Sequence, residues 1–210
     1  MRNRGRIAPG LALGAAIGLA GCTTAPPPSS DEDYVARVTS DRALKDKAFR
    51  ETRDSPIRTD DRATLLPLAY FAVDPSYRVA ASLSPATEST VLEMPTSTGQ
   101  RREMRRAGTL EFSLKNTPLT LTAFVEAQDR VMARLFVPFA DMTNGAETYA
   151  AGRYLDLDRT PTGLYDLDFN RAYHPYCYYN PEYDCPYPPS ENRLKLPVRA
   201  GERVPRAAGH

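Results

Sequence analysis

The sequence of 210 residues has no tryptophan, only two histidines and only three cysteines. So few histidines and cysteines leave little material for a metal cluster, or for a serine triad with its histidine base. The net charge of +1 lacks the basic excess that phosphate binding requires, so we expect no nucleic-acid partner. Glycine-rich phosphate-binding motifs are missing too, and we predict no cofactor.

The sequence also lacks an N-terminal apolar run long enough to span a membrane. The run from Leu11 to Ala20 would rise about 15 Å as a helix, against about 30 Å of hydrocarbon core. Three arginines among the first six residues precede it, and Leu19 to Cys22 (LAGC) end it. A basic start, a short apolar run and small residues are typical of a secretory signal peptide. The last four residues also resemble the bacterial lipobox, in which the cysteine is acylated and becomes the first residue of the mature chain.

We therefore predict a signal peptide at residues 1–21 and lipidation of Cys22, with an ordinary cleaved signal as the alternative. Residues 22–30 then form the lipidated cysteine and a proline-rich, extended spacer. Thr23 follows the cysteine where Asp would signal retention, so the resemblance to envelope lipoproteins implies the outer membrane, facing the periplasm. The expected partner is the membrane, through the anchor. Residues 31–205 would form one domain and residues 206–210 a tail.

Local patterns predict a mainly β domain that follows one helix. From Asp31 to about Arg53, apolar residues three and four apart predict an amphipathic helix capped by Ser30 or Asp31, with a break near residues 39–41. Later, apolar positions alternate, and residues 119–125 and 131–137 predict a hairpin. Further strands are predicted at residues 68–73, 77–83, 90–94, 108–114, 149–157, 164–169 and 194–198. Such short strands favour a single antiparallel sandwich or incomplete barrel.

Tyrosine and proline gather near the C terminus. Most of the twelve tyrosines lie between Tyr154 and Tyr187, interleaved with prolines. Because proline cannot donate to a sheet ladder, residues 170–190 are predicted to form a long ordered loop held down by aromatic rings. Ordered loops of this length are often functional.

Several motifs together resemble the domain-of-unknown-function family numbered 1684. They are LAYF (68–71), ETYAAGRYLD (147–156), LDFN (167–170), YHPYC (173–177), CPYPP (185–189) and EN (191–192). The resemblance covers about residues 34–203, and its C-terminal third is the specific part. His174 stands where asparagine is expected. The family has no established activity, so the resemblance implies one domain with the C-terminal loop as its signature.

Cys177 and Cys185 lie eight residues apart. In an exported protein such a pair favours a disulfide, which we predict, with two separate buried thiols as the alternative. His174 would add a third metal ligand, but the spacing does not match zinc motifs, and we predict no metal. His174 and Cys177 also suggest nucleophilic catalysis, although His174 replaces the residue expected in the family.

Six polar side chains of the aromatic region form the predicted ligand-binding set. They are Arg153, Asp156, Asp168, Asn170, Glu191 and Asn192. An aromatic pocket with a few fixed polar groups suits a small molecule or a glycan, whereas the same groups in an irregular loop satisfy its backbone. We predict a lipid-anchored, non-catalytic binding or structural module. The alternative is an envelope hydrolase that uses the carboxylates of Asp156, Asp168 and Glu191.

Overall fold

The computed structural model of the chain describes residues 30–88, 90–129, 131 and 133–205. The predicted signal peptide, Cys22, residues 23–29 of the spacer and the tail at 206–210 lie outside the described residues. Among the residues described, no helix combines the length and hydropathy that a membrane span needs.

The N-terminal helix α1 (Asp31–Glu51) begins at a capping box. The Ser30 hydroxyl accepts a hydrogen bond from the backbone N–H of Asp33, and the Asp33 carboxylate accepts one from the backbone N–H of Ser30. Two N–H groups that have no partner inside the helix are thereby satisfied. This confirms the N-cap at Ser30.

The predicted break near residues 39–41 is wrong, because α1 runs unbroken to Glu51. The row of side chains that faces the rest of the protein begins with Tyr34 and Val38 and continues with two cationic residues. Arg42 donates to the carbonyls of Phe71 and Asn170, and Lys45 pairs with Glu202. Residues four, four and three apart share a helix face, so the row keeps its helical spacing while its chemistry changes from apolar to polar.

Residues 52–77 connect α1 to the sheet. They contain η1 (Thr59–Asp61), α2 (Arg62–Leu65) and η2 (Pro75–Tyr77). The strand predicted at residues 68–73 is absent, and there Tyr70 alone makes an isolated bridge, to Glu202. This segment packs against α1 and the C-terminal segment (residues 169–205) instead of a neighbouring strand. Its apolar residues therefore face a helix and a loop and do not mark a β-strand.

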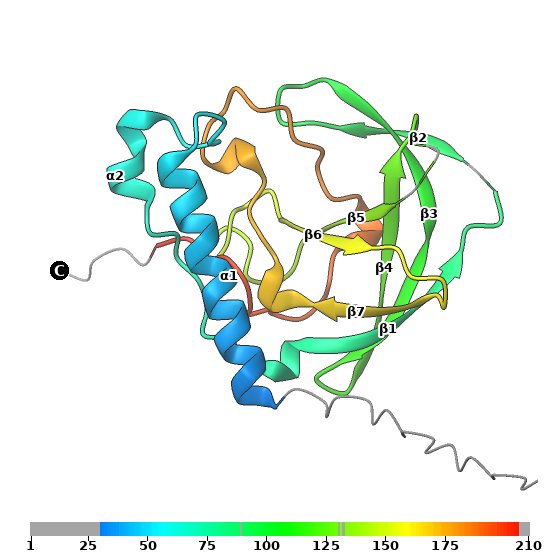
Figure 1. Cartoon of the computed structure of the whole chain (residues 1–210). Helices are drawn as coiled ribbons and strands as arrows, with labels where there is room; N and C mark the ends of the chain where they lie inside the picture. Colours follow the sequence, from blue (N-terminus) through cyan, green and yellow to red (C-terminus); the bar gives the residue numbers. More distant parts are fainter. Residues whose placement is uncertain (1–29, 89, 130, 132, 206–210) are drawn as a thin grey trace, which may run out of the picture.

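Seven antiparallel strands form one curved sheet (Figure 1). They are β1 (Arg78–Pro85), β2 (Val91–Pro95), β3 (Arg101–Leu114), β4 (Thr117–Glu126), β5 (Arg134–Phe139), β6 (Arg153–Asp158) and β7 (Leu164–Asp168). The order is β6-β5-β4-β3-β1-β7, and β2 pairs with β3. Because β6 also approaches β7, the sheet nearly closes into a barrel. This confirms the mainly β fold with an N-terminal helix.

The long strands β3 and β4 form the spine of the barrel. Lys115 and Asn116 join them in a two-residue turn, both with positive φ, which suits the twist of a tight hairpin. The predicted antiparallel pair of residues 119–125 and 131–137 is present as β4 and β5. Alternate residues of these strands, such as Leu121 and Val137, point into the main core.

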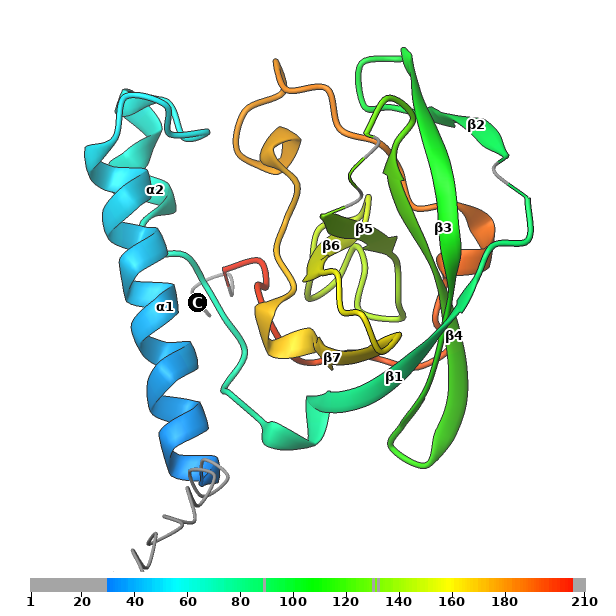
Figure 2. The ribbon, with the colours of Figure 1, turned by 45° about the vertical axis from the view of Figure 1, so that its right-hand side comes forward.

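The C-terminal segment lies between α1 and the barrel (Figure 2). After β7 it contains only the short turns η3 (Phe169–Arg171), η4 (Tyr176–Tyr178) and η5 (Ser190–Asn192). The strand predicted at residues 194–198 is therefore absent. Rings packed edge to face hold the segment, as Tyr173 does against Tyr154. This confirms the ordered loop at residues 170–190.

Candidate functional site

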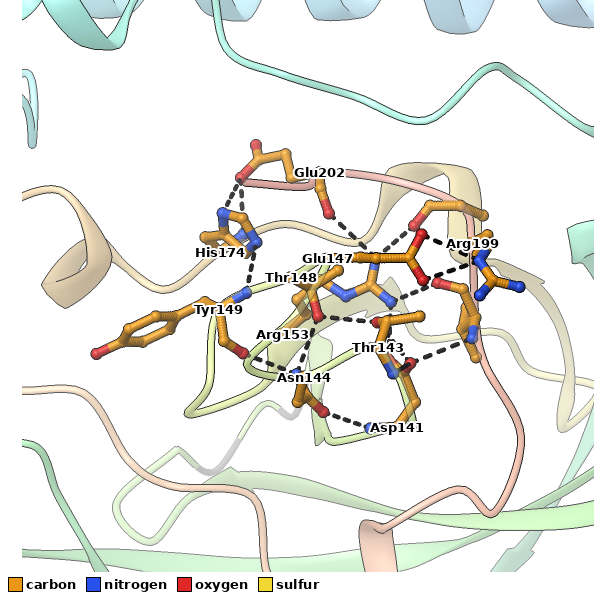
Figure 3. A network of polar contacts seen from close by, with 12 residues as sticks. Asp141, Thr143, Asn144, Glu147, Thr148, Tyr149, Arg153, His174, Arg199 and Glu202 are labelled. Atoms are coloured by element: carbon orange, nitrogen blue, oxygen red, sulfur yellow. Dashed lines mark hydrogen bonds and ion pairs between the residues drawn. The ribbon is translucent and has the colours of Figure 1, made fainter. Parts of the chain in front are cut away.

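Arg153, at the start of β6, is fully buried in a polar network (Figure 3). Its guanidinium pairs with the Asp141 carboxylate at 2.8 Å. It also donates to three backbone carbonyls, those of Val198, Ala200 and Glu202. Burial lowers the pKa of Arg153, and the Asp141 carboxylate opposes that shift. Because these carbonyls belong to residues 198–202, Arg153 joins β6 to the C-terminal segment.

Asn192 holds together two strands that diverge. Its side-chain oxygen accepts from the Thr122 N–H at 2.7 Å, and its amide donates to the carbonyls of Thr122 and Pro138. β4 and β5 pair only at Phe124 and Phe136, so the side chain takes the place of ladder hydrogen bonds. Asn192 is fully buried, and its contacts are structural.

Asp168 and Asn170 lie together beneath the first turns of α1. The Asp168 carboxylate accepts from the Tyr34 hydroxyl at 2.7 Å and from the backbone N–H of Asn170. Asn170 in turn bonds to the Tyr34 hydroxyl and to both backbone groups of Asp74. Burial first, and Asp168 next, raise the pKa of Tyr34. This pair anchors α1 to the end of β7.

Glu191 lies at the surface, where it pairs with Arg106 at 2.8 Å. Asp156 is also exposed, but it projects from β6 on the face opposite to Arg153 and Leu155. Residues of a strand separated by an odd number point to opposite faces. The structure therefore unites Asp168 with Asn170 but brings no other members of the predicted set together.

Asp156 lines a cavity of about 720 Å³. One wall is the outer face of strands β3 to β6, and the other is the C-terminal segment. Sequence reasoning had named only Asp156 of this wall as a ligand-binding residue. The lining residues are Lys45, Arg102, Met104, Val125, Glu126, Asp129, Arg134, Phe136, Tyr154, Asp156, Tyr173, Pro175, Tyr176, Tyr183, Asp184, Cys185 and Pro186.

Four tyrosine rings line the cavity. The Tyr173 hydroxyl donates to the Asp156 carboxylate at 2.8 Å, and Tyr176 and Tyr183 meet edge to face at 5.3 Å between centroids. Burial first, and Asp156 next, raise the pKa of Tyr173, so the phenol keeps its proton. The clustering of tyrosine was the one feature of the sequence that pointed to this wall. Which of the rings face the strands became visible only in the folded structure.

The charges around the cavity are largely neutralised by neighbours. Arg102 lies 3.4 Å from Asp184 and 3.8 Å from Glu126. The hydroxyl donors beside Asp184 lower the pKa of that carboxyl, with help from Arg102. Lys45 pairs with buried Glu202 at 2.6 Å. The cavity thus has polar groups without a strong charge of one sign.

His174 does not contact the thiol of Cys177 through either ring nitrogen. Nε2 accepts from the backbone N–H of Tyr149 at 3.2 Å, and Nδ1 lies 3.8 Å from Glu202 (Figure 3). Cys177 and Cys185 are both free, buried thiols in this structure, so the predicted disulfide is not formed in it. Within the described residues, no group of three or more His, Cys, Asp or Glu side chains is placed to hold a metal ion.

Comparison with known proteins agrees with the signature motifs. The family described as "Protein of unknown function (DUF1684)" matches residues 64–203. The solution NMR structure of an uncharacterised protein from Haloarcula marismortui is similar, with 37% identity and a TM-score of 0.65, over 82% of this chain and 95% of that one. No curated protein matches the chain. The chain belongs to the DUF1684 family.

Proposed function

We propose that the protein is a binding module whose ligand, a neutral polar molecule such as an oligosaccharide, occupies the cavity between β3–β6 and the C-terminal segment. The observation that carries the proposal is the wall of tyrosine rings around an exposed carboxylate, Asp156. A volume of about 720 Å³ lies within the usual range of ligand sites, roughly 300–1,000 Å³. Rings provide flat apolar faces, while Asp156 accepts hydrogen bonds from hydroxyl groups.

The balance of charge favours a neutral ligand. The three basic residues of the cavity each form an ion pair with an acidic residue, so their positive charge is already balanced and an anionic ligand gains little from them. They are Lys45, Arg102 and Arg134. A hydrolase that uses Asp156, Asp168 and Glu191 finds no support in the geometry. Glycosidases place two carboxylates within about 10 Å of each other across one bond. Here Asp156 lies in the cavity, Asp168 beneath α1 and Glu191 beside Arg106.

Thermal unfolding with and without sugars tests the proposal. The purified protein is heated in the presence of N-acetylglucosamine pentamer or maltopentaose, and unfolding is followed by circular dichroism. A ligand at 100 times its dissociation constant adds about 2.7 kcal/mol, a shift of several degrees. We expect the shift to disappear in Asp156→Asn and in Tyr176→Ala, whose side chains line the cavity.

The matched control is Glu191→Gln, which removes a carboxylate of the sequence-predicted set that lies outside the cavity. This variant should keep the full shift. A shift that survives both cavity variants, or one lost in Glu191→Gln alone, would place the ligand elsewhere. If neither oligosaccharide changes the unfolding temperature, the choice of sugars as the ligand class is wrong.

We also propose that the module is tethered to a bacterial envelope membrane through acylated Cys22. Its support is the N-terminal sequence: a basic start, a short apolar run and LAGC at 19–22. Two or more acyl chains give stable anchoring, at about 0.8 kcal/mol per buried methylene. Mass spectrometry of the protein from its native membranes should find diacylglyceryl-modified Cys22 as the first residue. A soluble chain that still begins at Met1 would contradict the anchor.

A further inference from the structure

The two cysteines of the C-terminal segment meet at the cavity wall, although they are eight positions apart in the sequence. The backbone N–H of Cys177 donates to the sulfur of Cys185 at 3.1 Å. Cys185 itself lines the cavity, while both side chains are almost fully buried among tyrosines. The pair therefore lies at the edge of the cavity, with Cys177 in contact with the Cys185 sulfur.

The position of Cys185 is fixed from both sides by one residue. Its backbone N–H donates to the Ser97 hydroxyl at 3.0 Å, and its carbonyl accepts from the Ser97 N–H at 2.9 Å. Cys177 lies in the middle of η4, and its neighbours Tyr176 and Tyr178 take part in the hydrogen bonds of that turn. The backbone on both sides of the pair is thus fixed by hydrogen bonds before any reaction.

The contacts also divide the protons unequally between the sulfurs. The Cys185 thiol donates toward the Cys177 sulfur and lowers the pKa of Cys177 to about 6, against the opposing effect of burial, and the Tyr149 hydroxyl assists. The same contact raises the pKa of Cys185. The contact between the two sulfurs therefore favours the thiolate of Cys177, and the thiolate is the form of cysteine that reacts with disulfides.

We propose that Cys177 and Cys185 are a redox-active dithiol that low-molecular-weight disulfides oxidise reversibly through the cavity. The Cys177 thiolate attacks one sulfur of the external disulfide, releasing one thiolate. The Cys185 thiol then loses its proton to that thiolate and attacks the Cys177 sulfur, which expels the second thiolate. Two electrons pass from the cysteines to the external disulfide, and one internal disulfide forms. This inference does not depend on the proposed function.

A glutathione titration of the full chain in mild detergent tests the proposal. The native protein is equilibrated with mixtures of reduced and oxidised glutathione, quenched in acid, alkylated and digested with trypsin. Both cysteines lie on the single fragment 172–193, since no Lys or Arg stands between Arg171 and Arg193. Cys22 falls on a different fragment. We expect fragment 172–193 to change from two alkyl groups to none, with the loss of two hydrogens, as the oxidised fraction rises.

The single variants provide the control. In Cys177→Ser and Cys185→Ser the remaining thiol has no partner, so the fragment should keep its alkyl group or carry glutathione, and it should never lose two hydrogens. Three results for the unmutated protein would overturn the proposal. They are two alkyl groups even in oxidised glutathione alone, a stable glutathione adduct as the end product, or a disulfide that persists in reduced glutathione alone.

Discussion

At the scale of single residues, His174 shows how burial selects a charge state. Its Nε2 accepts a hydrogen bond from the Tyr149 N–H, which is impossible if that nitrogen carries a proton. The imidazole is therefore neutral, although Glu202 lies 3.8 Å from the other ring nitrogen. Burial is the main cause that lowers the pKa of His174 to about 4, and nearby Arg153 and Lys45 act in the same direction.

We predict that this histidine makes stability depend on pH between about 6.5 and 4. In that window the unfolded chain binds a proton at His174 and the folded chain does not, so the free energy of unfolding falls as pH falls. The full loss is about 3 kcal/mol, and above pH 7 there is none. Urea unfolding at pH 7.5 and 4.5 measures it. His174→Asn should weaken the dependence, and equal losses in both proteins would contradict this assignment.

At the scale of elements, α1 shows that a helix can keep its spacing while its inward face changes chemistry. Tyr34, Val38 and Phe49 are buried, whereas the intervening Arg42 and Lys45 carry charges to the C-terminal segment. The helix begins at the Ser30 cap, and three acidic residues in its first turn stabilise the positive end of the helix dipole. Its stability therefore depends on its ends as well as on its packed face.

We predict opposite effects for one substitution at two places in this helix. Ser30→Ala removes the cap and should lower the free energy of unfolding by about 1 kcal/mol. Ser40→Ala, at an exposed position in the middle of α1, should raise it by a few tenths of a kcal/mol, because alanine has the higher helix propensity. Urea unfolding of both variants checks the signs. A Ser30→Ala protein as stable as the parent would show that the cap contributes nothing.

At the scale of the whole molecule, the C-terminal segment connects the barrel to the helix. Arg153 reaches it from β6 through the carbonyls of Val198, Ala200 and Glu202. The Glu202 carboxylate then accepts from Lys45 of α1 and from the Tyr179 hydroxyl. A fully buried arginine is tolerated here because its charge is paired and most of its donors have acceptors.

We predict that Arg153→Met destabilises the protein by about 3–5 kcal/mol, since it leaves the buried Asp141 carboxylate without its cation. Arg199→Met is the matched control from the same network. Its ion pair with Glu147 is exposed, and such pairs contribute about 0–1 kcal/mol. Denaturant unfolding compares the two. Similar losses in both variants would mean that burial does not decide the value of these pairs.

The local patterns of the sequence were sufficient for the class of fold. Alternation in β4 and β5, the Ser30 cap and the run of tyrosine and proline each act over a few residues, so each could be interpreted without knowledge of the rest. Motifs such as CPYPP at 185–189 also indicated the family that the comparisons identify. The strand predicted at residues 68–73 is wrong because Leu68 packs against α1 and the C-terminal segment. Leu194 and Val198 do lie in the main core, but residues 194–198 form no strand.

Only the tertiary structure decided which polar residues meet. Arg153 and Asp156 are three apart in the sequence, yet one turns to the core network and the other to the cavity, since β6 alternates its faces. Lys45 and Glu202 are 157 residues apart, and no local pattern relates them. Hydrophobic periodicity is a property of one element, whereas a buried ion pair or a cavity wall depends on how several elements pack together.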